Sequence, residues 1–110
     1  MPRSSAQSLT LRQVFARNVR LVRANAGRSQ EDVADQAQLD RTFIGSLERG
    51  ERNISIDNIE RIAGVIGVPA YELLHPDLPK ARGLDETLTR APRTQRLYTA
   101  APKKRVGRAS

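Results

Sequence analysis

The sequence predicts an all-α domain of about five short helices, residues 9–76, followed by a basic C-terminal tail, residues 77–110. Apolar residues recur at spacings of three and four, which is the period of a helix with one buried face. Ser, Thr, Asp or Pro precedes each predicted helix, and Gly follows most of them, as is common at helix ends. Residues 1–8 are polar and are expected to form a flexible N-terminus.

The first three predicted helices each begin at a capping residue. The first follows Thr10 and ends at Gly27, with an apolar stripe of Leu11, Phe15, Val19 and Val22. The second follows Ser29 and stops near Gln38, with a narrow face of Val33, Ala34 and Ala37. The third follows Asp40 and ends at Gly50, with Ile44 and Leu47 facing inward.

Two further helices complete the predicted domain. The fourth follows Ser55 and ends at Gly67, and its isoleucines and Ala63 repeat at helical spacing although β-branched residues are mediocre helix formers. The fifth is very short, opens at Pro69 and stops at Pro76. Proline suits the first turn because its missing N–H would have no partner there.

The positive charge is concentrated in the tail. The chain carries a formal charge of +7, yet residues 1–79 hold ten Arg and ten acidic residues. Residues 80–110 hold nine Lys and Arg against Asp85 and Glu86, with Pro and few apolar residues, so we expect disorder there. A strongly basic chain suggests an acidic partner, and nucleic acid is the first candidate. The tail is either a solvated end or an arm that follows DNA.

Composition argues against an enzyme and against a membrane or secreted protein. There is no Cys and a single His, His75, so neither thiolate metal sites nor imidazole clusters are expected. The motifs of nucleotide-binding loops, zinc proteases and serine hydrolases are absent from the sequence. No apolar run approaches the ~20 residues of a membrane helix, and no signal peptide is seen. We therefore expect a cytoplasmic, non-enzymatic protein without a cofactor or metal.

The second and third helices carry the functional signal. They are short, lie about three residues apart and follow a longer basic helix, which is the layout of a helix-turn-helix. The outward face of the third helix carries Arg41, Thr42, Ser46 and Arg49, with Phe43 beside them. Arg can bond guanine bidentately, and Thr, Ser or an aromatic ring can contact other base edges in the major groove. Residues at the start of that helix reach deepest into the groove.

Four short segments carry the resemblance to a known family, because they match it in the same order along the chain. They are GRSQEDVA at 27–34, RTFIGSLERG at 41–50, NIS at 53–55 and GVP at 67–69. Together they resemble the Cro/cI-type helix-turn-helix family, also called XRE, over residues 11–74. Short single-domain members such as the controller proteins of restriction–modification systems look most similar. The resemblance implies a five-helix lambda-repressor-like fold and a transcription regulator of a bacterium or phage.

The resemblance also implies roles for individual residues. It assigns base reading or groove packing to Arg41, Thr42, Phe43 and Ser46. It assigns contacts with the DNA backbone to Gln30, Arg49, Arg52 and Asn53. It predicts a structural salt bridge between Arg23 and Glu48. It places a homodimer interface at Tyr71, Leu73 and Leu74. Phe43 could equally be a core aromatic, and Tyr71 and Leu74 can serve the core and a dimer at once.

The sequence departs from the family pattern at four positions. Gln38 stands where the family usually has a turn glycine with positive φ, a conformation that costs another residue roughly 1 kcal/mol. Arg28 replaces a usual aliphatic residue, and Pro69 replaces the usual polar cap. Gly45 lies inside the recognition helix, where it costs ~1 kcal/mol relative to Ala. It either allows a close approach to DNA or is only tolerated.

The leading hypothesis is a sequence-specific regulator that binds double-stranded DNA as a dimer on an inverted repeat, with residues 40–49 as recognition helix. The alternative is an antitoxin or adaptor whose tail binds a protein partner through Leu84, Leu88, Leu97 and Tyr98. A third hypothesis is non-specific DNA binding by the tail. The hypotheses differ in whether a chain ending at Pro79 keeps its full affinity for an operator.

Overall fold

The structure, a computed structural model, describes residues 8–88 and contains six helices and no strand in that range. The helices are α1 (Leu11–Asn25), α2 (Gln30–Ala37), α3 (Arg41–Glu48), α4 (Ile56–Ile66), α5 (Ala70–Leu73) and α6 (Leu78–Ala81). The prediction of an all-α fold is confirmed. Predictions for residues 1–7 and 89–110 lie outside the described residues. Between Ser8 and Leu88, none of the helices has the length and apolarity needed to cross a membrane.

Side-chain caps begin the four longest helices, as the sequence predicts. Thr10 forms a reciprocal capping box with Gln13 at the start of α1. Ser29 and Ser55 each accept a hydrogen bond from the backbone N–H three residues on, and Asp40 accepts from the N–H of Thr42. Each bond satisfies a backbone donor that the helix itself leaves unpaired.

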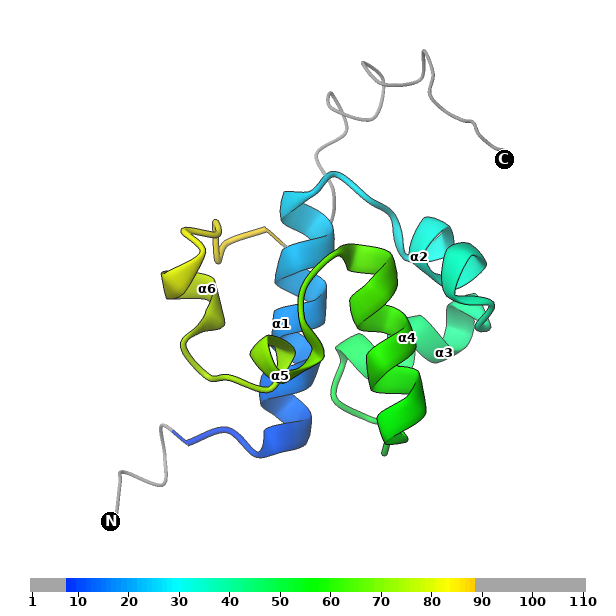
Figure 1. Cartoon of the computed structure of the whole chain (residues 1–110), viewed down its shortest axis with the longest axis horizontal. Coiled ribbons are helices and arrows are strands. Elements are labelled where there is room, and N and C mark those ends of the chain that lie inside the picture. The colour runs from blue at the N-terminus through cyan, green and yellow to red at the C-terminus, as the bar shows by residue number, and fades with distance from the viewer. Residues whose placement is uncertain (1–7, 89–110) are drawn as a thin grey trace.

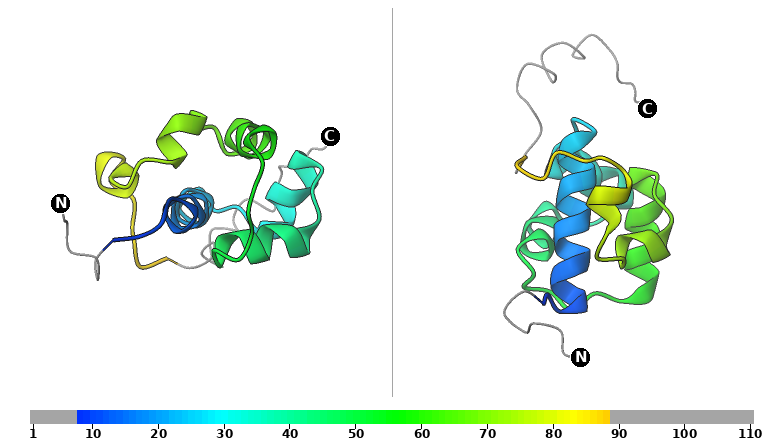
Figure 2. Two further views of the ribbon diagram at one scale, coloured as in Figure 1. Left: turned by 90° about the horizontal axis from the view of Figure 1, so that it is seen from below. Right: turned by 90° about the vertical axis from the view of Figure 1, so that its left-hand side faces the viewer.

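α1 lies at the centre of the fold (Figure 1), and α4 and α5 lie on one side of it in both views of Figure 2. The core contains fully buried side chains from four of the helices: Val19, Val33, Ile44 and Ile62. Two residues that the apolar pattern places inward are instead exposed, Leu11 at 60% and Ile56 at 80%. Both are the first residue of their helix, so their side chains lie at one end of the core rather than over it.

The folded part continues beyond residue 76, where the sequence predicts its end. α6 is a sixth helix that the sequence analysis does not predict, and its first residue, Leu78, is buried in the core. Pro79 occupies the first turn of α6, where proline is tolerated. The predicted boundary of the tail is therefore corrected to a position after α6 and the segment that follows it.

Residues 84–88, here called the clasp, bind back to α1. Asp85 donates its N–H to Asn25 Oδ1 at 2.9 Å, and Asn25 Nδ2 donates to the Asp85 carbonyl at 3.1 Å. Arg20 Nη1 donates to the carbonyl of Leu88 at 3.1 Å. Figure 2 shows the clasp passing α1 and ending on the side where α3 lies, away from α4 and α5. The described chain thus ends beside the C-terminal half of α1.

The turn between α2 and α3 contains a left-handed residue. Gln38 has φ 59° and ψ 44°, and it is the only non-glycine residue with positive φ among residues 8–88. Its backbone N–H still bonds the carbonyl groups of Ala34 and Asp35. Glutamine therefore adopts the positive φ that the family's glycine usually has at this position, and the turn is not changed by the substitution in this respect.

Arg28 forms contacts that an aliphatic residue could not. Its guanidinium donates to Asp32 at 2.8 Å, to Gln36 at 2.8 Å and to the carbonyl of Val65 at the end of α4. The departure from the family pattern thus exchanges one apolar contact for a polar link between α2 and α4.

Candidate nucleic-acid interface

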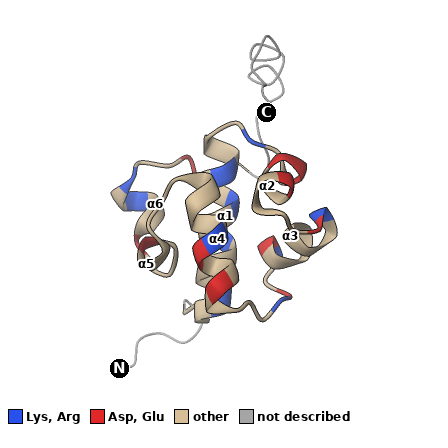
Figure 3. Ribbon diagram, turned by 45° about the vertical axis from the view of Figure 1, so that its right-hand side comes forward, with Lys and Arg blue, Asp and Glu red and all other residues tan. Residues whose placement is uncertain are grey.

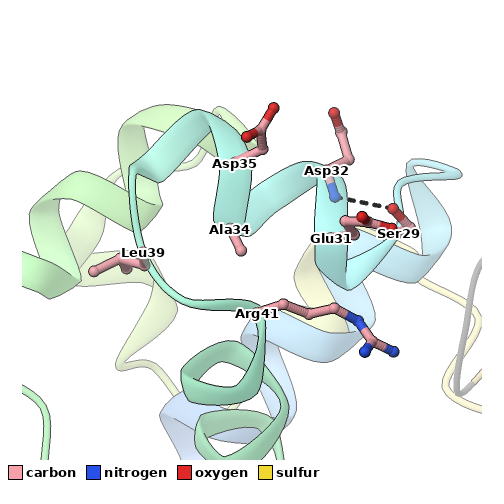
Figure 4. Close-up of a pocket in the computed structure, with 7 residues that line it drawn as sticks. All are labelled: Ser29, Glu31, Asp32, Ala34, Asp35, Leu39 and Arg41. Atoms are coloured by element: carbon pink, nitrogen blue, oxygen red, sulfur yellow. Dashed lines mark hydrogen bonds between the residues drawn. The ribbon is translucent and has the colours of Figure 1, made fainter.

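The start of α3 presents two exposed polar side chains, Arg41 and Thr42. Asp40 caps the helix through the N–H of Thr42 at 2.7 Å and so fixes the direction in which the first turn begins. Figure 4 shows the Arg41 side chain extending toward the Ser29 end of α2, where both residues line a surface pocket. Arg41 and Thr42 are therefore free to contact a partner, as the sequence analysis expects of residues at this end of the helix.

A buried ion pair joins α1 to α3. Arg23 Nε and Nη2 donate to the two oxygens of Glu48 at 2.6 and 2.9 Å, and Arg23 Nη1 donates to the carbonyl of Arg28 at 2.7 Å. Both side chains are almost completely buried. The predicted structural salt bridge is confirmed. Its two parallel bonds fix the last turn of α3 against α1.

Gln30, the first residue of α2, is tied to this pair. Its Nε2 donates to Glu48 Oε1 at 3.0 Å. Since a carboxylate only accepts hydrogen bonds, Glu48 determines which way the Gln30 amide is turned. The second hydrogen on Nε2 is not needed for this contact, so Gln30 retains a donor for a phosphate oxygen.

Gly45 lies between Gln30 and Arg49 rather than at an open surface. A Cβ atom at Gly45 would lie 3.4 Å from Arg49 Nη1 and 3.6 Å from Gln30 Oε1. Gly45 is itself buried. The glycine therefore leaves room for two side chains that are predicted to contact the DNA backbone, and it is not directly exposed for a close approach to DNA.

Arg49 is paired with a residue that the sequence analysis missed. Its Nε and Nη2 donate to the carboxylate of Glu51 at 3.0 and 3.1 Å, and both side chains are more than half exposed. The hydrogen bond from Arg49 lowers the pKa of Glu51, and the same bond raises the pKa of Arg49. A pair two residues apart in a turn has no periodic signal, which explains why sequence reasoning did not find it.

Ser46 is placed differently from the prediction. It is only 6% exposed, its hydroxyl donates to the carbonyl of Phe43 at 2.9 Å, and it accepts from Arg52 Nε at 2.8 Å. The Arg52 guanidinium also lies over the Phe43 ring, 5.3 Å from its centre. Ser46 therefore links α3 to the following turn and does not present its hydroxyl to a base, which corrects the expectation of base reading.

The remaining predicted residues divide between surface and core. Phe43 is half-buried and packs against the core as well as under Arg52, in agreement with the core-aromatic alternative left open above. Asn53 is exposed in the turn after α3. Tyr71 is 75% exposed, whereas Leu73 is fully buried and cannot contact a second copy of the folded chain, which corrects its assignment. Leu74 is half-buried against the core.

Acidic residues lie along α2, next to α3, which carries both charges because it begins at Arg41 and ends at Glu48 (Figure 3). Glu31 and Asp35 are exposed there, and Asp32 is half-exposed. Residues 8–88 as a whole hold eleven Lys and Arg against twelve Asp and Glu. The described domain therefore has no excess of positive charge, and three of its eleven cations, Arg41, Arg49 and Arg52, lie in α3 and the turn that follows. Within these residues no group of three or more metal-ligating side chains is gathered.

Two short helices that meet at a tight turn, with the second braced from behind and exposing Arg41 and Thr42, define a helix-turn-helix DNA-binding domain. The family model described as helix-turn-helix matches residues 19–73, and the chain belongs to this family. It is a transcriptional regulator of the XRE kind, with the lambda-repressor type of fold that the sequence analysis expects.

Similar proteins are transcription factors and controller proteins. A hypothetical transcription factor of Neisseria meningitidis serogroup B is 46% identical over 69% of this chain and 72% of its own. Control protein C.BamHI of Bacillus amyloliquefaciens is 43% identical over 58% of this chain and 80% of its own. The crystal structure of the Neisseria transcription factor superimposes with a TM-score of 0.60 at 50% identity, covering 66% of this chain and 79% of that one.

A solved complex adds a nucleic acid to the comparison. The restriction–modification controller protein C.Esp1396I, crystallised as a tetramer with its natural 35 base-pair operator, is 31% identical and superimposes with a TM-score of 0.56. The match covers 61% of this chain and 92% of that protein.

Proposed function

We propose that this chain is a sequence-specific regulator that binds an inverted-repeat operator as a homodimer, with α3 in the major groove. The observation that carries the proposal is the exposed Arg41–Thr42 pair at the capped start of α3. Residues at this end of a recognition helix contact base edges in helix-turn-helix proteins. The similarity to a controller protein that was crystallised on its operator supports the same mode of binding.

In the proposed complex Arg41 reads a base and the surrounding residues hold the phosphates. A bidentate contact of Arg41 with guanine would discriminate one base pair by roughly 1–3 kcal/mol. Gln30, Arg49, Arg52 and Asn53 lie around the ends of α2 and α3, where backbone contacts would fix the register without reading sequence. Two copies of α3 would enter major grooves about 34 Å apart.

The dimer contact we propose centres on Tyr71. An aromatic side chain that is 75% exposed is a typical residue of an interface core, and the half-buried Leu74 lies three residues further on. Leu73 contributes only by holding α5 on the core. We expect Tyr71→Asp to shift the chain toward a monomer in sedimentation experiments and to weaken operator binding without unfolding the domain.

The experiment that tests the proposed function is selection of bound sequences from a random duplex library with the full chain at physiological salt. We expect a palindromic consensus with half-sites about one helical turn apart. Arg41→Ala should then relax the preference at one position of each half-site. Arg61→Ala, which removes an exposed arginine of α4, is the matched control and should keep the consensus. If Arg41→Ala lowers affinity equally on every sequence, the base-reading role is wrong.

For the alternative function, an antitoxin or adaptor that binds a protein through its tail, the set of proposed contact residues has to be reduced. Leu84 and Leu88, two of its four proposed contact residues, are half-buried in the clasp, and Leu84 packs against the core. A protein partner would therefore have to use residues beyond Leu88. If the full chain binds no DNA and the selection therefore enriches no sequence, this alternative would be favoured.

A further inference from the structure

Asn18 of α1 is a fully buried polar residue whose amide nitrogen binds the end of α5. Its Nδ2 donates to the carbonyl of Leu73 at 2.8 Å and to the carbonyl of His75 at 2.9 Å. Leu73 is the last residue of α5, so its carbonyl has no partner within that helix. Both amide hydrogens of Asn18 therefore hold the backbone at the C-terminal end of α5.

Arg17, the preceding residue, completes this attachment. Its Nε and Nη2 donate to Asn18 Oδ1 at 3.3 and 3.1 Å. Its Nη2 also donates to the carbonyl of Pro76 at 2.6 Å. The carboxamide of Asn18 is thus held on both sides, with its oxygen on Arg17 and its nitrogen on the backbone. The two neighbouring side chains of α1 together fix the path of the chain as it leaves α5.

α5 depends on such attachments because it is short. It has four residues, no side chain caps its start, and Leu73 is its one buried residue. A helix of this length is not stable by itself, so its direction is set by the groups that bind it. Tyr71, the centre of the proposed dimer contact, lies two residues before Leu73. The orientation of the proposed dimer surface on α1 therefore depends on Asn18.

α1 also holds the proposed recognition helix, through a residue five positions after Asn18. Arg23 forms the buried ion pair with Glu48 at the end of α3. In both views of Figure 2, α3 lies on one side of α1 and α5 lies on the other. α1 therefore connects the two helices through two polar contacts. In a symmetric dimer, the distance and the twist between the two copies of α3 follow from how each is placed relative to the dimer surface.

We infer that Asn18, supported by Arg17, is the positioning residue that sets the spacing between the two half-sites of the operator. The inference rests on the proposed function, because it needs α3 on DNA and α5 in the dimer contact. One added base pair moves a half-site by about 3.4 Å along the duplex and rotates it by about 34–36°. A dimer whose α5 is fixed on α1 must deform the DNA to reach both half-sites after such a change. A dimer whose α5 can turn on α1 follows the change at little cost.

The test compares variants of the full chain that remove different contacts of α1. Asn18→Ala removes the bonds to α5 and its loop. Arg17→Met removes the bond to the carbonyl of Pro76 and keeps Asn18, so it serves as the test if Asn18→Ala does not fold. The matched controls are Asn25→Ala and Arg20→Met, which change the same residue types of α1 but remove bonds to the clasp.

Affinity is measured on a duplex with one half-site and on operators whose spacer is native, or is one or two base pairs longer or shorter. We expect the wild type and both controls to lose at least ~10-fold in affinity for each base pair of change, because the DNA must be deformed. Asn18→Ala should lose at most ~3-fold per base pair, and Arg17→Met should lie between. Affinity for the single half-site should stay within ~2-fold of the wild type in every variant, since the contacts of α3 are unchanged.

Three results would overturn the inference. The first is a wild-type spacing profile in Asn18→Ala, or in Arg17→Met if the former does not fold. The second is an equal loss of half-site and operator affinity, which would mean that Asn18 acts through the stability of the whole domain. The third is a monomer in sedimentation with normal half-site affinity, which would mean that Asn18 is needed to form the dimer rather than to set its geometry.

Failure of the proposed function is seen with the wild type alone. A wild-type chain that prefers no spacing would refute the proposed dimer, and this inference with it. A wild-type preference that all four variants share would refute the inference and leave the proposed function intact.

Discussion

Gln30 Nε2 and Arg23 Nη2 both donate to the same atom, Glu48 Oε1, at 3.0 and 2.9 Å. A residue at the proposed DNA surface is thus held by an ion pair inside the domain. Because both residues bind Glu48 Oε1, a change in the buried ion pair would also change the position of Gln30 at the proposed phosphate contact.

Breaking the ion pair should cost more stability than replacing it. Glu48→Gln leaves the buried Arg23 without its carboxylate, and we expect the free energy of unfolding to fall by about 3–5 kcal/mol. The double variant Arg23→Met/Glu48→Leu removes both charges and should recover much of that loss. Urea unfolding of the wild type, of Arg23→Met, of Glu48→Leu and of the double variant measures the coupling. Additive effects would show that the pair does not act as a unit.

The left-handed turn residue offers a stabilising substitution. Gln38→Gly removes the strain of a side chain at φ 59°, and we expect a gain of about 0.5–1 kcal/mol after the added freedom of the unfolded chain. Asp35→Gly, three residues earlier on the exposed face of α2, is the control and should destabilise by about 0.3–0.5 kcal/mol. A loss of stability in Gln38→Gly would mean that the side chain contributes more than its backbone strain costs. Thermal unfolding of both variants measures this.

Gly45→Ala should separate folding from DNA binding. Alanine is the better helix residue by about 1 kcal/mol, and its Cβ would meet Arg49 Nη1 at 3.4 Å, which limits the positions open to that guanidinium. We expect unchanged or higher stability together with operator affinity reduced several-fold. Gly64→Ala in α4, where a Cβ meets nothing within 4 Å, should raise stability and keep the affinity. Equal operator affinity in the two variants would show that Arg49 can move aside freely.

Ser46→Ala distinguishes a structural hydroxyl from a base-reading one. The substitution removes the bond from Arg52 and frees that guanidinium from its place over Phe43. We expect a modest loss of affinity that is the same on operator and altered operator sequences. Loss of discrimination at one base position would instead restore the original assignment of Ser46. Competition binding with a panel of single-base operator variants gives the answer.

The Arg49–Glu51 pair should be visible in a titration. Because the Arg49 hydrogen bond lowers the pKa of Glu51, the carboxylate stays charged below its ordinary pKa, and the pair is lost only as pH falls through the lowered value. Arg49→Gln should raise the pKa of Glu51 back toward the ordinary range. Side-chain carboxyl shifts followed by NMR over pH 2–7 would measure both. An unchanged pKa would mean that Arg52, not Arg49, sets it.

The sequence predicts the elements whose signals are local. Capping residues place the starts of the four longest helices, and the polar start of α3 correctly indicates exposure of Arg41 and Thr42. The failures have physical reasons. Ser46 is polar and lies on the face read as outward, but the turn after α3 folds over it and uses its hydroxyl. α6 has only four residues, too few for a helical period to show.

Contacts between distant residues also escape a reading of the sequence. Asn25 and Asp85 lie 60 residues apart, and neither belongs to an apolar pattern that could indicate their pairing. The sequence gives no reason to treat Leu73 and Leu74 differently, because a helix of four residues is too short to show which of its faces is buried. The C-terminal boundary of the domain and the buried faces of its shortest helices therefore cannot be predicted from the sequence and are seen only in the structure.

The clasp also has a consequence for the order in which the domain matures. α1 is the first helix to be synthesised. The carbonyl groups that its Arg20 and Asn25 bind belong to Leu88 and Asp85, which follow 68 and 60 residues later. Pairing across such separations is slow compared with local helix formation. The helix-turn-helix can assemble while translation continues, whereas the opposite flank of α1 is completed only when Leu88 has emerged. If translation stalled before Leu88, the domain would contain a folded α3 but would lack the hydrogen bonds between the clasp and α1.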